Sequence, residues 1–168
     1  MKSTLNPLVI LITGCSSGFG LLTAARLASR GHRVIASMRN LNKSGAILDE
    51  VKIRGGKVDL IQLDVTDKNS VKSELVNADL LVNATSLGLK PNDSTIVSKS
   101  DFPKKKMLVY DLIYHVKKTP LLRLASRLGH RIKNGETMLL AQGAKAFEIW
   151  TGKKAPVTVM RKALQNAV

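Results

Sequence analysis

A glycine-rich stretch near the N-terminus has the residue types that bind phosphate groups. It reads Thr13-Gly14-Cys15-Ser16-Ser17-Gly18-Phe19-Gly20, between an apolar run at residues 8–12 and an amphipathic pattern that ends before Gly31. Glycine allows positive φ angles and a close approach of the main chain to a ligand, and a helix start offers unpaired N–H groups and a positive dipole end. The stretch is therefore predicted to be a strand, a phosphate-binding turn and a helix, with a dinucleotide as the ligand.

Further strand and helix patterns alternate along the chain and must position this turn. Apolar strand patterns occupy residues 33–38, 58–63 and 79–84, and a helical pattern at residues 42–54 ends at Gly55-Gly56. Such an alternation forms a parallel sheet with right-handed crossovers, and its ligands lie at the carboxyl ends of the strands. The sequence predicts an α/β fold: a single doubly wound domain over residues 1–168, with about six parallel strands in the order 3-2-1-4-5-6 and helices on both faces.

The residue after the second strand distinguishes the two nicotinamide dinucleotides. An Asp or Glu at this position bonds a free ribose 2′-hydroxyl, but Arg39 occupies it here. A guanidinium holds a 2′-phosphate through paired, charge-assisted hydrogen bonds. NADP is therefore predicted in preference to NAD, and the alternative is that Arg39 is an ordinary surface arginine at a helix start.

Residues 8–71 resemble the first half of the short-chain dehydrogenases/reductases, which have a Rossmann fold. The spacing T-G-x-x-x-G-x-G, the position of Arg39 and the pair Asp64-Val65 carry this resemblance. It implies that Asp64 and Val65 border the adenine. It also implies contact with the cofactor by the turn residues Gly14, Ser16, Ser17, Gly18, Phe19 and Gly20.

From Ala78 onward the sequence resembles the cofactor-binding half of shikimate dehydrogenases. The motifs are Asn83-Ala84-Thr85-Ser86-Leu87-Gly88, residues 109–114, Thr119-Pro120-Leu121-Leu122, Asn134-Gly135, residues 138–140, Gln142-Gly143-Ala144 and residues 147–153. The resemblance implies that Asn83, Ala84, Thr85, Gly135 and Met138 contact the cofactor, the last two near the nicotinamide. It implies that Tyr114 and Gln142 contact the substrate; plain core packing of Met138 and simple exposure of Gln142 are the alternatives. His115-Val116 replaces the family's usual Asn-Pro pair, so the loop after Tyr114 is expected to differ.

The two resemblances meet near residues 74–78, which predicts a recombined or engineered chimera of two Rossmann halves. Shikimate dehydrogenases take a catalytic lysine and aspartate from a separate N-terminal substrate domain, and the sequence shows no counterpart of it. No catalytic residue is therefore assigned. The primary interpretation is an NADP(H)-binding domain without a complete catalytic site, which does not oxidise shikimate and is not an enzyme.

Three further interpretations remain open from the sequence. The first is a small NADP-dependent reductase with Tyr114 as its acid, because Tyr114 and Lys118 have the Y-x-x-x-K spacing of short-chain reductases. Thr119-Pro120 predict that the next helix begins after this pair, so the two side chains are not expected on one helical face. The second is a basic nucleic-acid binder, and the third is a fold without useful affinity.

The amino-acid composition limits which partners and which kinds of site are expected. The net charge is +15, with residues 79–168 the more basic part, and such a surface attracts phosphates; aromatic residues make up only 4% of the chain, which leaves few platforms for stacking bases. The single cysteine, Cys15, excludes an internal disulfide and a multi-cysteine metal site, and no metal is predicted. No secretory leader is evident, and no apolar stretch reaches the roughly 18 residues of a membrane helix, so a soluble, cytoplasmic protein is expected.

A helical pattern at residues 137–151 has apolar residues on several sides and is expected to need more than one neighbour. Two arrangements satisfy this need. A homodimer through this helix is the favoured one. In the second arrangement, the terminal helix at residues 156–167 folds back and covers it with Val157, Met160 and Leu164.

Overall fold

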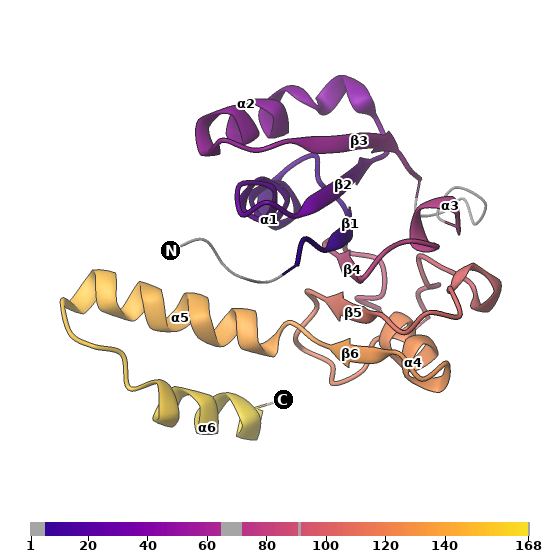
Figure 1. Cartoon of the computed structure of the whole chain (residues 1–168). Coiled ribbons are helices and arrows are strands. Elements are labelled where there is room, and N and C mark those ends of the chain that lie inside the picture. The colour runs from indigo at the N-terminus through magenta and orange to yellow at the C-terminus, as the bar shows by residue number, and fades with distance from the viewer. Residues whose placement is uncertain (1–5, 65–71, 91, 168) are drawn as a thin grey trace.

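Six parallel strands form one sheet in the computed structural model, which describes residues 6–64, 72–90 and 92–167. The strands are β1 (Val9–Thr13), β2 (Arg33–Met38), β3 (Val58–Gln62), β4 (Leu80–Asn83), β5 (Leu108–Asp111) and β6 (Arg131–Lys133). Their order across the sheet is β3-β2-β1-β4-β5-β6 (Figure 1). The predicted strand order, direction and fold class are confirmed.

Between β4 and β5 the described residues contain only a 3-10 turn at Lys99–Asp101, but helices follow each of the other five strands. The helices are α1 (Gly18–Ala28), α2 (Gly45–Arg54), α3 (Lys72–Leu75), α4 (Pro120–Arg127), α5 (Glu136–Thr151) and α6 (Val157–Ala167). The predicted helix at residues 42–54 is divided, because a 3-10 turn at Leu41–Lys43 precedes α2 and the Asn40 side chain accepts a hydrogen bond from the Asn42 N–H at 2.9 Å. The predicted helix start at Thr66 lies outside the described residues.

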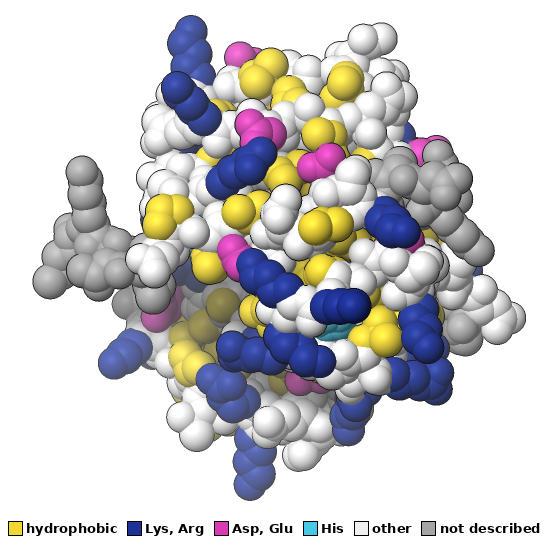
Figure 2. All heavy atoms as spheres, turned by 45° about the vertical axis from the view of Figure 1, so that its right-hand side comes forward, with side chains coloured by type: hydrophobic (Ala, Val, Ile, Leu, Met, Phe, Trp, Pro, Cys, Tyr) yellow, Lys and Arg dark blue, Asp and Glu magenta, His cyan; other side chains and the backbone are white. Residues whose placement is uncertain are grey.

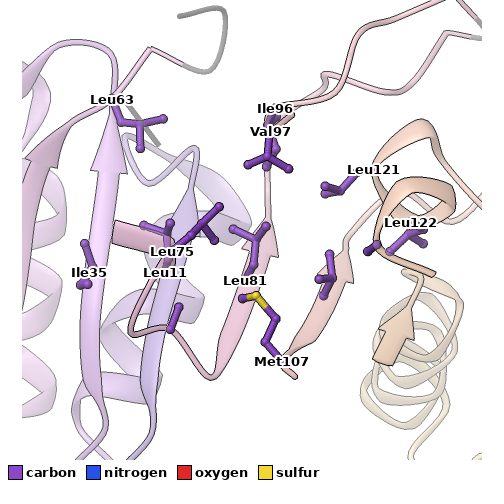
Figure 3. Close-up of a cluster of buried hydrophobic side chains, with 13 residues drawn as sticks. Leu11, Ile35, Leu63, Leu75, Leu81, Ile96, Val97, Met107, Leu121 and Leu122 are labelled. Carbon is purple, nitrogen blue, oxygen red and sulfur yellow. The ribbon is translucent and has the colours of Figure 1, made fainter. Parts of the chain in front are cut away.

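Helices cover both faces of the sheet (Figure 1). On one face, α3 and α4 pack on Leu11, Ile35, Leu81 and Val109, which are buried in one apolar cluster (Figure 3). On the opposite face, α1 and α2 pack on Ile10, Ile12, Val34, Ala36 and Val82. Successive side chains of a strand point to opposite faces, so short apolar runs in β1, β2 and β4 supply both clusters.

The last two helices lie beside one another and extend past the sheet (Figure 1). A Cβ on Gly143 of α5 would lie 3.5 Å from Met160 Cε of α6, so the alternative arrangement, in which the terminal helix folds back on α5, is present with Met160 as a contact residue, whereas Val157 is 39% exposed. Leu140 is the only buried residue of α5 within this single chain, so the expectation of neighbours on several sides of the helix stays a prediction. Ile149 and Trp150, near the end of α5, are 68% and 83% exposed.

Candidate cofactor-binding site

The glycine-rich turn lies between the end of β1 and the start of α1. Gly14 and Gly18 have φ angles of 77° and 58°, which L side chains rarely adopt. A Cβ on Gly14 would lie 2.9 Å from the Ala84 carbonyl oxygen, and a Cβ on Gly20 would lie 2.3 Å from the Gly14 carbonyl oxygen. These two glycines therefore allow the turn to pack on β4, whereas a Cβ on Gly18 would meet nothing within 4 Å.

The first turn of α1 is open to an anion. Ser17 is the N-cap residue, but its side chain does not cap the helix, and no acidic residue occupies the first turn. Ser17 and Gly18 are exposed, Ser16 is half-buried, and the Phe19 side chain is 53% exposed. Uncapped N–H groups and the dipole of an 11-residue helix favour a negative group at this point.

Cys15 lies inside the turn but is unsuited to nucleophilic chemistry. Its side chain is fully buried, its Sγ donates to the Ile12 carbonyl at 3.3 Å, and its N–H donates to the Ser37 carbonyl at 2.9 Å. Burial raises the pKa of the Cys15 thiol to about 12. Cys15 thus anchors the turn to β2.

A thiol reagent is expected to modify Cys15 in the native protein about a thousandfold more slowly than in the unfolded chain, because the thiolate is scarce and covered. Absorbance of the released thiolate in a reaction with an aromatic disulfide measures both rates. Because Cys15 is the single cysteine, the unfolded chain in denaturant is its own control. Equal rates with and without denaturant would contradict the buried position.

Arg39 follows β2 at the carboxyl edge of the sheet, beside the turn. Its side chain is exposed and makes no hydrogen bond or ion pair with another described residue. Asp64 is half-buried and follows β3, one strand further along the same edge. Val65 lies outside the described residues. The structure therefore places Gly18, Arg39 and Asp64 at the carboxyl ends of three neighbouring strands, where sheets of this kind bind ligands.

Asn83 is the most connected of the predicted cofactor residues. It is fully buried, and its Oδ1 accepts from the Thr85 N–H at 3.1 Å, from Thr85 Oγ1 at 2.7 Å and from Thr13 Oγ1 at 3.2 Å. The Ala84 N–H donates to the Thr13 carbonyl at 3.2 Å. Asn83 thus fixes the segment that carries Ala84 and Thr85, and direct contact of these three residues with a cofactor stays a prediction.

The sequence reasoning assigned no role to two buried polar residues, one on β5 and one on β2. Asp111 ends β5 and has no exposed surface, and its register partner on β4 is Asn83. Ser37 on β2 is also buried, and its hydroxyl has no hydrogen-bond partner among the described residues. An aspartate inside the apolar run 108–113 is a signal that points to Asp111, because a buried carboxylate requires donors around it.

The residues predicted to face nicotinamide and substrate lie on two adjoining segments. The Gly135 N–H donates to the Ile113 carbonyl at 3.0 Å, and a Cβ on Gly135 would lie 2.1 Å from the Leu112 carbonyl oxygen. This contact places the start of α5 against the segment that carries Tyr114, which is 40% exposed. Met138 is half-buried, and Gln142, one turn further along α5, is exposed.

Tyr114 and Lys118 do not lie on one helix. Residues 112–119 contain no helix, and α4 begins at Pro120 with the Thr119 Oγ1 accepting from the Leu122 N–H at 3.3 Å. The expectation that the helix starts after this pair is confirmed. The geometry that gives a tyrosine–lysine pair its acidity in a helix is therefore not present at Tyr114.

A cleft of about 600 Å3 opens beside β6, between α4, the start of α5 and the end of α6. Lys117, Lys133, Asn134 and Gln165 are among its lining residues. None of the predicted site residues lines this cleft. The glycine turn and Arg39 instead form an open surface at the sheet edge.

Basic side chains gather toward the lower part of the face in Figure 2, at the height of α4, β5 and β6.

Within residues 6–64, 72–90 and 92–167, no group of three or more His, Cys, Asp or Glu side chains is arranged to hold a metal ion. In the same ranges, no helix has the length and apolar character needed to cross a membrane.

Two family models match the chain. The short chain dehydrogenase model matches residues 8–105, and the model of the shikimate 5'-dehydrogenase C-terminal domain matches residues 135–165. The first match extends beyond residues 74–78, where the two resemblances were predicted to meet. That junction stays a prediction.

Similar proteins also come from whole-chain comparisons. A shikimate dehydrogenase (NADP(+)) of Methanopyrus kandleri is 36% identical over 152 residues, which cover 89% of this chain and 51% of the relative. A crystal structure of shikimate dehydrogenase in complex with NADP+ has a TM-score of 0.78 and 30% identity, covering 96% of this chain and 55% of its own. The Listeria monocytogenes shikimate 5-dehydrogenase in complex with shikimate and NAD has a TM-score of 0.77 and 26% identity, with coverages of 94% and 55%.

The chain spans about half the length of the curated relatives it matches, whose covered shares are 51%, 38% and 46% for three of them. An alignment over 89% of this chain necessarily crosses residues 74–78. The strand order and the glycine turn are both consistent with the family model that matches residues 8–105. The chain therefore belongs to the short chain dehydrogenase family, and its C-terminal part matches the shikimate 5'-dehydrogenase C-terminal domain.

Proposed function

We propose that the chain is the NADP(H)-binding part of a dehydrogenase of the shikimate dehydrogenase type. The observation that carries this proposal is the glycine turn at the uncapped start of α1, with the exposed Arg39 on the next strand. The NADP(+) named for the relatives and the NADP+ in a similar structure support it.

The residues present fit a dinucleotide. The open space outside Gly18 and the uncapped start of α1 suit a pyrophosphate, and Arg39 suits a 2′-phosphate. Asp64 lies where the adenosine part would be expected. When bound, NADP(H) supplies a hydride donor or acceptor, and the protein supplies position and electrostatics.

The substrate side is proposed to be Tyr114 and Gln142, with Gly135 and Met138 near the nicotinamide. Because the relatives are about twice as long, we propose that the acid and base of the reaction come from residues outside this chain. This chain alone is then expected to bind cofactor without oxidising shikimate. The predicted chimera is the second candidate, favoured by matches to two family models on one chain.

The proposal is tested by titrating the protein with NADPH and following the fluorescence of the dihydronicotinamide. Saturable binding to the unmutated chain is expected. In Gly18→Ala binding is expected to weaken about tenfold or more, because the new methyl group occupies the space where the pyrophosphate approaches the main chain.

Gly55→Ala is the matched control. Gly55 also has a positive φ, 72°, and open space around its Cβ position, so both variants carry a similar conformational cost of about 1 kcal/mol. Gly55 ends α2 at the amino side of β3, away from the turn. No binding by the unmutated chain, or equal binding by both folded variants, would refute the site.

The predicted homodimer through α5 is also proposed. α5 carries two acidic residues, Glu136 and Glu148, and one basic residue, Lys145, so two copies of this basic chain are expected to repel each other little along this helix. The exposed side chains of Ile149 and Trp150 offer apolar area. Light scattering over a concentration series is expected to give twice the monomer mass. Trp150→Ser is expected to weaken association, while Ile53→Ser, at a residue 79% exposed on α2, leaves it unchanged. A monomer mass at high micromolar concentration would end the proposal.

A further inference from the structure

We infer that Asp111 is a positioning residue that couples the segment 84–88, beside the glycine turn, to the segment 112–119, which carries Tyr114. This inference rests on the proposed function, because it names how the cofactor side and the substrate side of that site act on each other. It begins from the hydrogen bonds around a single buried carboxylate.

The two oxygens of Asp111 bond to different segments. Its Oδ1 accepts from Asn83 Nδ2 and from the Ile113 N–H, each at 3.2 Å. Its Oδ2 accepts from Thr119 Oγ1 at 2.7 Å. A carboxylate only accepts hydrogen bonds, so all three partners must present a hydrogen to it.

On the cofactor side, this requirement fixes the orientation of the Asn83 side-chain amide. One Nδ2 hydrogen of Asn83 points to Asp111, and its second hydrogen is donated to the Leu87 carbonyl at 3.1 Å. The amide oxygen then faces Thr85, which donates with both its N–H and its hydroxyl. The segment 84–88 is therefore held at both ends by one side chain, whose orientation Asp111 determines.

On the substrate side, Asp111 holds both ends of the segment that contains Tyr114. Ile113 lies at its start and Thr119 at its end. Because the Thr119 hydroxyl donates to Asp111, its lone pair remains free to cap α4 through the Leu122 N–H. The Ile113 carbonyl accepts from the Gly135 N–H, so the start of α5 follows the same segment.

Stability alone does not account for this carboxylate. Burial raises the pKa of Asp111, and the hydrogen bonds from Thr119, Ile113 and Asn83 only partly oppose this. With the folded pKa above the unfolded one, the contribution of this group to stability falls as pH rises from the ordinary value of 3.8 through the raised one. A buried carboxyl group retained under this cost is consistent with a positioning role.

Hydrogen–deuterium exchange measured by mass spectrometry, with and without NADPH, tests the coupling in the full chain. In the unmutated protein, NADPH is expected to slow exchange in peptides that cover residues 14–20, 84–88 and 112–119. In Asp111→Leu, protection of residues 14–20 is expected to remain, whereas the protection transmitted to residues 112–119 is expected to fall about tenfold.

Asp111→Asn is the conservative variant, because its amide oxygen still accepts from Asn83 Nδ2 and the Ile113 N–H while its NH2 donates to Thr119. It is expected to restore the transmitted protection. Thr13→Val is the matched control, since it removes a buried hydrogen bond to Asn83 without touching Asp111. It is expected to transmit protection normally. If Asp111→Leu does not fold, Thr119→Val takes its place, because it breaks only the bond to Asp111 Oδ2 and the α4 cap. In Thr119→Val the NADPH-dependent protection of residues 112–119 is then expected to be lost.

The outcomes separate the two proposals. Without NADPH protection of residues 14–20 in the unmutated chain, the proposed function fails. Protection of residues 14–20 that reaches residues 112–119 equally in the unmutated protein and in Asp111→Leu overturns the coupling and leaves the function intact. Equal losses in Thr13→Val and Asp111→Leu would show a merely structural network and also overturn it.

Discussion

NADPH is expected to bind the unmutated chain more tightly than NADH, and Arg39→Asp is expected to reverse this order. The guanidinium offers paired, charge-assisted hydrogen bonds to a 2′-phosphate, whereas a carboxylate repels the phosphate and accepts from a 2′-hydroxyl. Hydrogen bonds to charged groups are worth roughly 1.5–3 kcal/mol, so NADPH affinity is expected to fall by about tenfold to a hundredfold. Fluorescence titrations with both cofactors measure the ratio.

Arg30→Asp is the control for this charge change. Arg30 is exposed and follows α1 at the amino edge of the sheet, so it alters the net charge equally without standing near the carboxyl ends of the strands. It is expected to lower the affinities for both cofactors slightly and to leave their ratio unchanged. A similar shift of the ratio in both variants would assign the preference to overall charge and not to Arg39.

Gly20→Ala is expected to destabilise the fold by about 3 kcal/mol, because the new methyl carbon would lie 2.3 Å from the Gly14 carbonyl oxygen. This oxygen belongs to the main chain, so no side-chain rotation relieves the contact. For a chain of this size the melting temperature is expected to fall by about 6–12 °C. Thermal unfolding followed by circular dichroism measures the change.

Gly45→Ala separates this steric effect from the general effect of adding a methyl group in a helix. Gly45 is the first residue of α2, lacks a positive φ, and has nothing within 4 Å of its Cβ position. Its replacement is expected to leave stability unchanged or to raise it by up to about 1 kcal/mol, because alanine has the higher helix propensity. Equal melting temperatures for the Gly20 and Gly45 variants would disprove the close contact in the turn.

The order of the strands could be predicted from the sequence because the first three apolar runs alternate with helical patterns and the glycine turn marks the first crossover, which together indicate a doubly wound sheet. The surroundings of α5 could not. Its apolar residues predict burial, but how many of them are covered depends on which parts of the chain reach the helix, and in the presence of α6 only Leu140 of α5 is buried. A local pattern specifies a helix and not its neighbours.

The positions of Gly18 and Arg39 in the candidate site could be predicted, because each of them follows an apolar strand pattern in the sequence. The bonds of Asp111 were not predictable, because they join residues 28 positions apart at Asn83 and 8 apart at Thr119, and depend on strand register. Asn83 was singled out from its sequence motif, but the hydrogen bonds of its buried side chain to neighbouring residues were not predicted. The Ser37 hydroxyl, which has no hydrogen-bond partner among the described residues, could not be singled out from the sequence.

The contact of the glycine turn with β4 limits how parts of this chain can be interchanged with those of different proteins. Ala84 Cβ would lie 3.2 Å from a Cβ on Gly20, and its carbonyl oxygen already borders Gly14. Whatever the source of the fourth strand, its end therefore has to place a small residue at position 84 against the first crossover. A segment transplanted between residues 20 and 84 keeps this contact, whereas a donor with a bulky residue at position 84 would push the turn outward, whatever its own strand pattern.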